Sequence, residues 1–557
     1  MNAAIGGNAT GSGPDSEGDL ALAEAVVAAL QRCGATEVVV CAGARNAALV
    51  AVLAATPSLR LWSFPEERSA GFFALGRALA REAPVAVVTT SGTAVAELLP
   101  AVIEAHYQGV PMIMVTADRP RGFRGTGAPQ AIEQAGLFSG YVAAAGDVAT
   151  VAEWASFEEA ILGWDGGRPM HWNICLEEPS ADALARARPV TAESRPAPKV
   201  PRADAETVEK FLGDSAAGPL VAVVAALPTQ EQVTVARFLQ RLGCPVIAEA
   251  TSGLREWHEL AGQHVFAGEA TLARLPVGRV LRIGGVPSSR WWRDLECRPS
   301  VRVLSLTASG FPGLARPSAV SGFPDWDQVV IPTDWRVAQP WDPEAARLLA
   351  TTLAEAIDGH PRGEPALVHA LSRRIPWGSL VFLGNSLPIR EWNVFATTGN
   401  RFLRCHANRG ANGIDGCVST FLGLGTEEET SWAVIGDLTA LYDLAALWIT
   451  PALPAARRNL ASARRRIAII NNGGGRIFSR VAALRELPAT SRRFMENPHG
   501  LAFHAWADLF GWGYAKATTP DEIGEAAERR DPNLILEIVP DPAETEAAWA
   551  CLAKIKV

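Results

Sequence analysis

One stretch of the chain, residues 432–438, reads Trp-Ala-Val-Ile-Gly-Asp-Leu, and a second, residues 466–475, reads Arg-Ile-Ala-Ile-Ile-Asn-Asn-Gly-Gly-Gly. In each, an apolar run ends in polar residues and glycine. This pattern is typical of a strand that is buried on both faces of a parallel sheet, followed by the loop that leaves it. The carboxyl ends of parallel strands meet at one edge of the sheet, where open α/β sheets bind ligands. The two stretches therefore predict an α/β fold with a site at this edge.

At the predicted edge, Asp437 and Asn472 are candidate ligands of a divalent cation. Their carboxylate and amide oxygens are hard donors. With a backbone carbonyl, two phosphate oxygens and a water they complete the octahedron that Mg²⁺ requires. The glycines that follow let the backbone approach phosphates closely. Such a pair is more often a turn Asp and a turn Asn, so this alternative stays open at this point.

Similar apolar runs predict further parallel strands, at residues 37–41, 59–64, 84–90, 111–116, 220–225, 280–283, 301–306, 379–383 and 533–539. Helical spacing of apolar residues predicts helices over residues 20–33, 69–81 and 93–108, the last kinked or restarted at Pro100. Linker-like stretches at residues 186–202 and 338–344 divide the chain. We expect a disordered tail over residues 1–18 and three doubly wound parallel-sheet domains over residues 19–188, 203–338 and 345–557.

Composition excludes several classes of protein. The 557 residues carry 51 Lys and Arg against 59 Asp and Glu, a net charge of −8, which argues against a nucleic-acid partner. The eight cysteines contain no Cys-x-x-Cys pair, which excludes a disulfide scaffold and favours the cytoplasm. No apolar run reaches the length of a membrane span. The five arginines of residues 457–466 are interpreted as a solvated insertion.

A second group of candidate functional residues lies in the N-terminal part of the chain. Glu66 and Glu67 precede the helix expected over residues 69–81, where an acidic side chain can simply stabilise the helix N-terminus. An N-terminal Glu combined with the Gly-Asp and Asn-Asn motifs is, however, the pattern of thiamine-diphosphate enzymes. Further characteristic motifs follow in order, at residues 67–76 (Glu-Arg-Ser-Ala-Gly-Phe-Phe-Ala-Leu-Gly), 90–96 (Thr-Ser-Gly-Thr-Ala-Val-Ala), 116–120 (Thr-Ala-Asp-Arg-Pro), 384–387 (Gly-Asn-Ser-Leu), 408–416 (Asn-Arg-Gly-Ala-Asn-Gly-Ile-Asp-Gly) and 477–479 (Ile-Phe-Ser).

In these motifs the chain resembles the MenD family, the synthases of menaquinone biosynthesis that make 2-succinyl-5-enolpyruvyl-6-hydroxy-3-cyclohexene-1-carboxylate. The resemblance covers most of both outer domains and is faint in the central one. It implies that the N-terminal domain binds the pyrimidine of thiamine diphosphate and that the third domain binds its diphosphate. It further implies decarboxylation of 2-oxoglutarate and addition of the four-carbon carbanion to isochorismate. The active sites would lie at the subunit interface of a homodimer or homotetramer, with Glu67 and Asp437 from different chains.

The resemblance also assigns roles to residues. Glu67 would be catalytic. Its carboxyl group would form a hydrogen bond to the aminopyrimidine ring of the cofactor and stabilise the imino tautomer, whose nitrogen takes the proton from the thiazolium ring. Asp437, Asn472 and the Gly474 carbonyl would hold Mg²⁺ or Mn²⁺. The remaining cofactor contacts would come from Ser91, Gly92, Thr93, Ser386, Ile414, Gly436, Leu438, Ile477 and Phe478. Both substrates carry two carboxylates, which require local cations. The matching positions are Arg45, Arg119, Arg290, Arg390 and Arg409, with Gln130 and Ser386 as hydrogen-bond partners.

The chain departs from the family pattern at Ala44, Pro129 and Gly473, where the family has serine, asparagine and asparagine. By the resemblance, Ala44 lacks a hydroxyl contact to substrate, and Pro129 lacks a donor and stiffens its loop. All three changes leave Glu67, Asp437 and Asn472 in place. Two alternatives therefore stay open. One is another thiamine-diphosphate-dependent carboligase or decarboxylase of 2-oxo acids, and the other is a non-catalytic relative.

Overall fold

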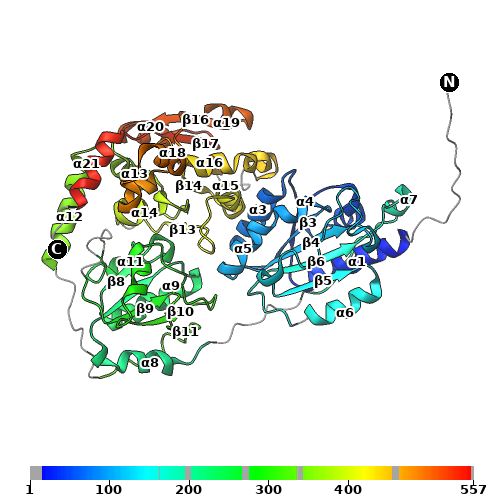
Figure 1. The fold of residues 1–557 in the computed structure, drawn as a ribbon, viewed down its shortest axis with the longest axis horizontal. Helices are drawn as coiled ribbons and strands as arrows, with labels where there is room; N and C mark the ends of the chain where they lie inside the picture. Colours follow the sequence, from blue (N-terminus) through cyan, green and yellow to red (C-terminus); the bar gives the residue numbers. More distant parts are fainter. Residues whose placement is uncertain are drawn as a thin grey trace. The chain divides into compact units, whose positions relative to one another are not determined.

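The computed structural model describes residues 16–553, except residues 162, 195–201, 266–271, 273–274, 334, 336–342, 400 and 455–462. Two compact units divide the chain: residues 1–106 with 110–198, and residues 107–109 with 199–557. The first contains one sheet and the second contains two (Figure 1). Residues 1–15 of the expected tail lie outside the described residues, and the first helix begins at Ser16. The expected domain boundaries stay predictions.

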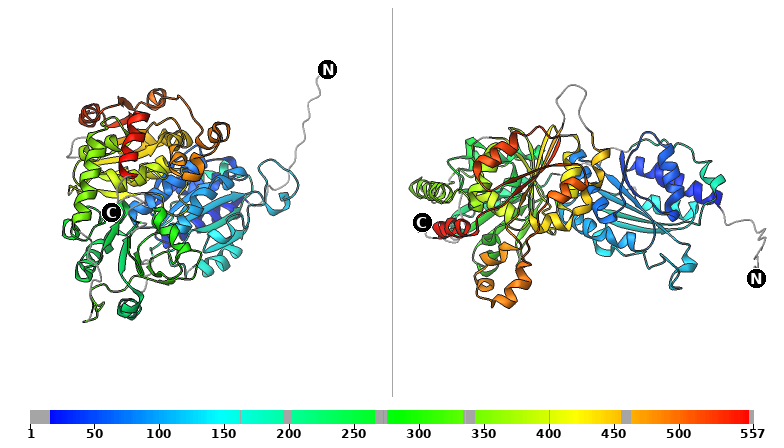
Figure 2. Two further views of the ribbon diagram at one scale, coloured as in Figure 1. Left: turned by 60° about the vertical axis from the view of Figure 1, so that its left-hand side comes forward. Right: turned by 90° about the horizontal axis from the view of Figure 1, so that it is seen from above.

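The sheet of the N-terminal unit is entirely parallel, with helices on both faces (Figure 2). Its strands, in spatial order, are β2 (Arg60–Ser63), β1 (Glu37–Cys41), β3 (Val85–Thr89), β4 (Met112–Asp118), β6 (Met170–Cys175) and β5 (Ala144–Val148). One face is covered by α1 (Ser16–Arg32), α2 (Ala47–Ala55) and α6 (Val151–Ile161). The other is covered by α3 (Glu67–Arg81), α4 (Thr93–Glu97) and α5 (Leu99–Gln108). The break between α4 and α5 confirms the restart predicted at Pro100.

The larger unit contains a five-stranded and a six-stranded parallel sheet. The five strands, in spatial order, are β11 (Ala319–Ser321), β10 (Arg302–Leu306), β9 (Arg279–Ile283), β7 (Leu220–Val224) and β8 (Val246–Ala248). The six strands are β13 (Arg404–His406), β12 (Leu380–Leu383), β14 (Thr430–Gly436), β15 (Arg464–Ile470), β17 (Asn533–Ile538) and β16 (Gly513–Ala517). All three sheets are therefore parallel, as predicted.

The helices of the larger unit lie around its two sheets (Figures 1 and 2). Near the five-stranded sheet lie α8 (Ala205–Gly213), α9 (Thr229–Leu242) and α11 (Arg290–Asp294). The six-stranded sheet shares one apolar core with α13 (Glu364–Arg374), α14 (Leu387–Phe395) and α20 (Pro520–Glu528). The remaining helices of this part are α12 (Pro343–Asp358), α15 (Cys417–Leu424), α16 (Asp437–Tyr442), α17 (Ala482–Arg485), α18 (Ala489–Glu496), α19 (His504–Leu509) and α21 (Pro542–Ala553).

The two six-stranded sheets have the same strand order. In each, the first and third strands are central neighbours, and the chain leaves them toward opposite edges. Such a switch point opens a crevice at the carboxyl ends of the two strands. A Cβ on Gly43, after β1, would collide with the side chain of Thr90, after β3. At the equivalent place, a Cβ on Gly384, after β12, would lie 3.0 Å from the Cα of Ile435 in β14. Both crevices therefore depend on a glycine at the same topological position.

The structure corrects one interpretation of the sequence. Arg465 and Arg466, which were expected in a solvated insertion, are buried at the start of β15. The guanidinium of Arg465 donates to the carbonyls of Thr426 and Pro454, and that of Arg466 donates to the carbonyls of Arg529 and Asp531. These carbonyls reduce the cost of burying the two guanidinium groups, although Nε of Arg465 has no partner among the described residues. Residues 455–462 of the same stretch lie outside the described residues.

Helix α3 is attached to the N-terminal sheet by a buried ion pair. Arg77 donates to both carboxylate oxygens of Glu37, at 2.8 and 2.6 Å, and Trp62 donates to the same carboxylate at 2.7 Å. Burial alone would raise the pKa of Glu37, but the hydrogen bonds and the charge of Arg77 outweigh it and lower that pKa. This pair connects the helix that begins with Glu67 to the first residue of β1.

Glu37→Ala should destabilise the N-terminal unit by about 3–5 kcal/mol, because it leaves the Arg77 charge buried without its carboxylate. Hydrogen–deuterium exchange of the β1 and α3 amides measures the loss. Arg81→Ala is the matched control, since Arg81 lies 3.7 Å from the same carboxylate and its side chain is 42% exposed. It should cost at most about 1 kcal/mol. Equal effects of the two substitutions would contradict the assignment.

Candidate active site

Asp437 joins the carboxyl ends of β14 and β15. Its side chain is buried, and one carboxylate oxygen accepts hydrogen bonds from the backbone N–H groups of Gly473 and Gly474, at 2.8 and 2.9 Å. The other oxygen accepts from Leu438 N–H at 2.6 Å. Burial raises the pKa of Asp437, although these backbone donors partly offset the shift. A nearby cation would favour the ionised carboxylate.

Asn472 supplies a second oxygen to the same edge. Its amide nitrogen Nδ2 lies 3.1 Å from both carboxylate oxygens of Glu364. Its amide oxygen Oδ1 is buried and accepts no hydrogen bond from any residue in the described ranges. A buried amide oxygen without a donor is costly unless something else satisfies it. A divalent cation fits this oxygen and the carboxylate of Asp437, because both are hard oxygen donors.

The glycine run around Gly474 is held closely by the last residue of α18, Glu496, and by the segment that follows it. A Cβ on Gly474 would lie 2.5 Å from the carbonyl oxygen of Glu496, and the φ of Gly474 is 135°. Gly475 N–H donates to the same carbonyl at 2.6 Å. The Gly474 carbonyl accepts one hydrogen bond, from Arg476 N–H at 2.8 Å, which leaves its second lone pair available to a metal. His499 Nε2 lies 3.4 Å from Asp437 and adds a polar group beside the carboxylate.

Two buried carboxyl groups stand behind Asn472. Glu364 is the first residue of α13 and Glu391 lies in α14, and both are almost fully buried. Burial raises the pKa of Glu364 and of Glu391, and the proximity of the two groups raises that of Glu391 further. The negative charge of one carboxylate therefore disfavours ionisation of the other.

The loop after β12 organises the rest of this edge. Asn385 donates to the carbonyls of Asn408 and Gly413, each at 2.7 Å, and accepts from Arg409 at 2.9 Å. Ser386 has a φ of 73°, which is strained for a residue with a side chain. Its carbonyl accepts from Arg390 at 2.6 Å. The structure thus brings together the motifs 384–387 and 408–416, which lie far apart in the sequence.

The apolar residues assigned to the cofactor lie on two segments of the same unit. Ile414 precedes α15, and Ile477 and Phe478 lie in a short 3₁₀ helix, Arg476–Arg480. All three are partly exposed. They are therefore accessible to a ligand rather than absorbed in the core.

Glu67 opens α3 at the carboxyl end of β2 in the N-terminal unit. The helix cap is supplied by its neighbour Glu66, whose side chain accepts from the N–H groups of Arg68 and Ser69. The capping role considered for an acidic residue here thus belongs to Glu66. Burial, with the neighbouring charges of Glu66 and Glu97, raises the pKa of Glu67, although a backbone hydrogen bond partly opposes the shift. A carboxyl group that titrates closer to neutral pH suits proton exchange.

Two arginines lie near each other in the N-terminal unit. Arg45 is buried in a short 3₁₀ helix after β1 and donates to the carbonyl of Leu176 at 3.0 Å. Arg119 follows β4 and donates to the carbonyl of Pro129 at 2.8 Å. Burial and the like charge of Arg119 lower the pKa of Arg45. A bound carboxylate would relieve this repulsion.

The cofactor motif Ser91-Gly92-Thr93 follows β3 and touches Gln130. Gly92 has a φ of 86°, and a Cβ there would lie 3.1 Å from the Cα of Gln130. This edge thus unites Arg45, Arg119, Gln130 and the motif. Arg290, in contrast, lies in the other unit, where its half-exposed side chain pairs with Asp294.

Gln134 is a site residue that the sequence did not reveal. Its side chain is fully buried, accepts from Gly92 N–H at 2.7 Å and donates to Ala117 O and Asn173 Oδ1, at 3.1 and 2.8 Å. Thr116 donates to the same Asn173 oxygen at 2.9 Å. A single glutamine in a loop forms no pattern, so the sequence held no signal for this contact.

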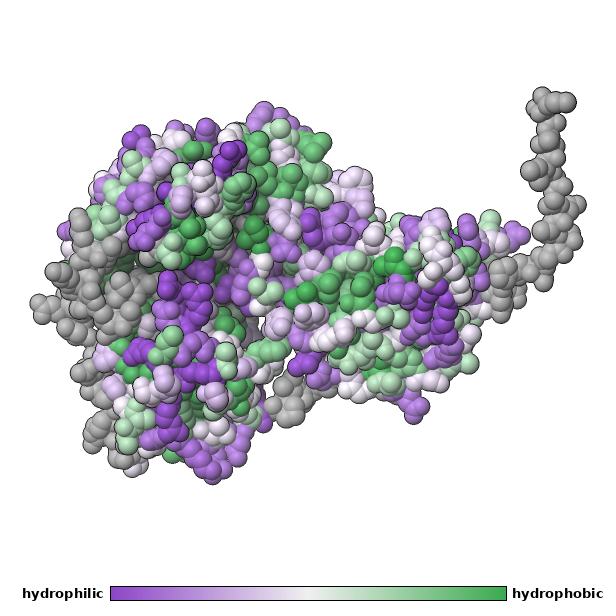
Figure 3. Space-filling model, viewed as in Figure 1, coloured by the Kyte–Doolittle hydropathy of each residue, from purple (hydrophilic) through white to green (hydrophobic). Residues whose placement is uncertain are grey.

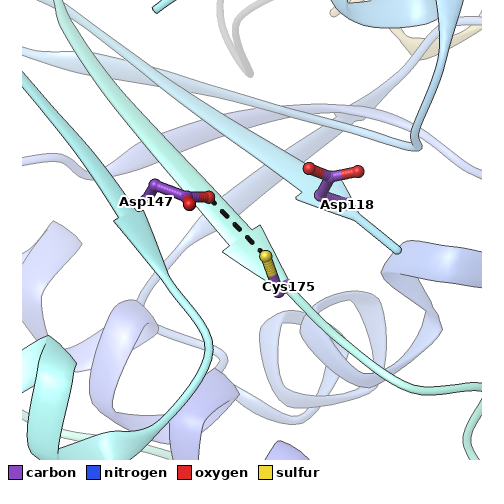
Figure 4. A group of neighbouring side chains, drawn as sticks. All are labelled: Asp118, Asp147 and Cys175. Carbon is purple, nitrogen blue, oxygen red and sulfur yellow. Dashed lines mark hydrogen bonds between the residues drawn. The ribbon is translucent and has the colours of Figure 1, made fainter. Parts of the chain in front are cut away.

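Asp118, Asp147 and Cys175 form a compact group at the ends of β4, β5 and β6 (Figure 4). This group has the composition of a metal site, but Arg124 donates to both carboxylates, at 2.8 Å to Asp118 and at 2.6 Å to Asp147. Asn173 also donates to both. The positive charge that the group needs is therefore already present, and its role is to hold the loop that follows Asp118.

Comparisons with known proteins agree with this geometry. The family model described as thiamine pyrophosphate enzyme, N-terminal TPP binding domain, matches residues 20–137. The fold is similar to that of a putative thiamin diphosphate-dependent enzyme isolated from Mycobacterium smegmatis, with a TM-score of 0.66, 16% identity and coverage of 93% of this chain and 99% of that one. The fold is thus that of thiamine-diphosphate enzymes.

Two relatives identify the family within the thiamine-diphosphate enzymes. The 2-succinyl-5-enolpyruvyl-6-hydroxy-3-cyclohexene-1-carboxylate synthase of Bdellovibrio bacteriovorus is 39% identical over 550 residues, covering 95% of this chain and 98% of its own. The synthase of the same name from Akkermansia muciniphila is 39% identical over 530 residues, covering 94% and 97%. The chain belongs to this synthase family.

Gln134→Leu should weaken the binding of thiamine diphosphate, because it leaves the buried Gly92 N–H without its acceptor. An unpaired buried donor costs about 1–3 kcal/mol, which corresponds to a roughly 5- to 150-fold rise in Kd if the loop must be ordered for binding. Isothermal titration calorimetry in Mg²⁺ measures it. Gln328→Leu, which alters an exposed glutamine, is the control. An unchanged Kd for Gln134→Leu would refute the role assigned to this contact.

The raised pKa of Glu67 makes the stability of the cofactor-free protein depend on pH. The unfolded chain releases this proton near the ordinary value of 4.5, and the folded chain releases it at higher pH. Stability from this group is therefore complete below pH 4.5 and falls as the pH rises through the folded pKa. Glu67→Gln stays neutral, so its Tm should exceed that of the wild type by more at pH 8 than at pH 5.

Scanning calorimetry at the two pH values measures this difference. Glu66→Ala is the matched control, since it removes the helix cap instead of the buried acid and should lower Tm at both pH values. A Tm difference for Glu67→Gln that does not grow with pH would show that the Glu67 carboxyl has an ordinary pKa.

Proposed function

We propose that the chain decarboxylates 2-oxoglutarate and adds the resulting four-carbon carbanion to isochorismate, giving 2-succinyl-5-enolpyruvyl-6-hydroxy-3-cyclohexene-1-carboxylate and CO2 in menaquinone biosynthesis. The observation that carries the proposal is the combination of near-full-length similarity to synthases of this name with an intact set of Glu67, Asp437 and Asn472. Its cofactors are thiamine diphosphate and Mg²⁺ or Mn²⁺.

The residues of the larger unit would hold the diphosphate through the metal. Asp437 and the Oδ1 atom of Asn472 are the side-chain ligands, and the Gly474 carbonyl is a third. The chemistry that bound thiamine diphosphate supplies is nucleophilic attack on the 2-oxo carbon and storage of the electron pair left when CO2 departs. Ile477 and Phe478 exclude water beside the reacting centre. A dry environment favours decarboxylation, because the negative charge of the carboxylate disperses as CO2 leaves.

Glu67 holds and exchanges the proton on the aminopyrimidine ring. Two features support this role. Its pKa is raised by burial, and its side chain is not the helix cap. A carboxyl group with a raised pKa binds a proton more readily than an ordinary one, and it can donate that proton to a ring nitrogen and later accept it back, as general acid–base catalysis requires.

The arginines provide the positive charge that the substrate carboxylates need. Arg45 and Arg119 lie at one sheet edge with Gln130, and Arg390 and Arg409 lie at another with Ser386. Arg290 stays a candidate, although its present partner is Asp294. The departure at Pro129 keeps a useful group, since its carbonyl accepts from Arg119.

Oligomerisation is part of the proposal. Tyr442, Leu444 and Trp448, which follow the Asp437 motif, are 50%, 40% and 53% exposed. Exposed clusters of large apolar side chains mark interaction surfaces, and apolar patches are visible on the larger unit (Figure 3). We expect a homodimer or homotetramer whose active sites combine Glu67 of one subunit with Asp437 of another.

The cytoplasmic location and the absence of a nucleic-acid partner stay predictions. None of the described helices combines the length and hydrophobicity that a membrane crossing needs.

Turnover by the purified protein with thiamine diphosphate and Mg²⁺ tests the proposal. Isochorismate and 2-oxoglutarate together should give the coupled product and CO2 in equal amounts. CO2 release from 2-oxoglutarate that isochorismate does not divert into product would favour another carboligase or decarboxylase. No turnover of either kind would favour a non-catalytic relative.

In the same assay, Glu67→Gln should lower kcat by about 100- to 10,000-fold, because the amide cannot exchange the proton that the carboxyl group would.

Arg45→Ala should raise KM for a dicarboxylate substrate and leave the Kd for thiamine diphosphate within about threefold of the wild type. Removing one partner of a buried charge pair costs about 2–5 kcal/mol, or roughly 30- to 5,000-fold. Steady-state kinetics and calorimetry separate the two effects. Arg237→Ala, on the exposed side of α9, is the control. An unaltered KM would remove Arg45 from the substrate site.

A further inference from the structure

We propose that Glu364 is a positioning residue for the metal site, because it fixes the amide of Asn472 with its oxygen toward the cation. This inference rests on the proposed function, in which Asn472 is a metal ligand. Glu364 belongs to no motif of the sequence and lies 108 residues before Asn472. It is the first residue of α13, whereas Asn472 follows β15.

The contact between the two side chains has a defined polarity. A carboxylate only accepts hydrogen bonds, and the Asn472 atom placed against it is the donor Nδ2, 3.1 Å from Oε1 and 3.1 Å from Oε2. The acceptor Oδ1 is therefore turned away from Glu364. It is the buried atom that lacks a donor among the described residues.

An asparagine without such a partner can rotate its amide by half a turn, because the two ends have nearly the same shape. Here the reversed amide would place Oδ1 against the carboxylate of Glu364, and two acceptors would face each other in a buried site. It would also direct the donor Nδ2 at the cation. Glu364 thus excludes the orientation in which Asn472 could not bind a metal, which is how groups behind a ligand tune a metal site.

Glu364 is itself held rigidly. Its backbone N–H donates to Thr545 Oγ1 at 3.0 Å, and its side chain is 2% exposed. The residue before it, Gly363, packs so closely that a Cβ there would lie 3.1 Å from the carbonyl group of Glu544. The carboxylate therefore has little freedom to follow Asn472 if the amide turns.

Metal affinity of the holoenzyme tests the inference without relying on turnover. Mn²⁺ is titrated into protein at a fixed concentration of thiamine diphosphate, a titration without protein gives the Mn²⁺ bound by the cofactor alone, and free Mn²⁺ is followed by electron paramagnetic resonance. Glu364→Gln has the same shape but carries a donor as well as an acceptor, so it pairs with either orientation of the Asn472 amide and no longer excludes the reversed one. Its Kd for Mn²⁺ should rise about 10- to 100-fold, while the Tm of the metal-free protein does not fall.

A double variant separates positioning from a merely structural effect. In Asn472→Asp combined with Glu364→Gln, the new glutamine can donate to one oxygen of the new aspartate and leave the other for Mn²⁺. The Kd of this double variant should return to within about fivefold of the wild type. Asn472→Asp alone sets two carboxyl groups against each other and should bind Mn²⁺ more weakly than the double variant. Glu231→Gln, a buried carboxylate bonded to Trp326 in another part of the unit, is the matched control and should leave the Kd unchanged.

The outcomes are distinguishable. If the wild type binds Mn²⁺ tightly and Glu364→Gln binds it equally well, or if the double variant is no better than Glu364→Gln, the positioning role is wrong and the proposed function stands. If the wild type with thiamine diphosphate does not bind Mn²⁺, the proposed metal site fails, and the inference fails with it.

Discussion

The carboxylate of Asp437 holds together the two strand ends on which the larger unit builds its site. It accepts N–H groups from the start of its own helix and from the loop after the neighbouring strand β15, so the relative position of the two loops is set by one side chain. This arrangement places a buried negative charge among backbone donors, and burial raises its pKa. The buried negative charge of Asp437 is therefore costly, and a bound divalent cation would lower that cost. This is the reason to expect a metal there rather than a simple turn.

The same strand order produces a different chemistry in the N-terminal unit. Both six-stranded sheets have a switch point closed by a glycine, Gly43 in one and Gly384 in the other. Where the second sheet continues from β14 into Gly-Asp, the first continues from β3 into Thr-Ser-Gly. This strand end therefore presents hydroxyl groups instead of a carboxylate, and the acidic side chain of this edge is Glu67, after β2. One topology thus supplies a carboxylate held by backbone donors in one sheet, and two neighbouring arginines with a separate carboxyl group, Glu67, in the other.

The central strands could be predicted from the sequence because they are continuous apolar runs, and their parallel arrangement followed from that pattern. The strand β6 could not, although it is fully buried, because His171 and Asn173 interrupt its apolar run and are satisfied by a buried network instead of by water. The other missed strands, β5, β8, β11, β13 and β16, are edge strands, most of them short or partly exposed. The site motifs were found because each is a run of neighbouring residues. Gln134 and Glu364 were missed because their partners lie 42 and 108 residues away, and only the fold brings them together.

The departures at Ala44 and Pro129 are best understood through the rigidity of the loop after β4. Asp118 accepts the N–H of Arg119 at 2.8 Å and is tied by Arg124 to Asp147, so the loop begins in a fixed network. Pro129 then restricts the backbone where the loop meets the cofactor motif, and its carbonyl holds the guanidinium of Arg119. A rigid loop loses less conformational entropy when a substrate binds. Preorganised arginine can therefore offset the loss of an asparagine amide and a serine hydroxyl. If Arg45 and Arg119 bind a substrate carboxylate as proposed, Ala44 and Pro129 alter the hydrogen bonds around it and leave the positive charge in place.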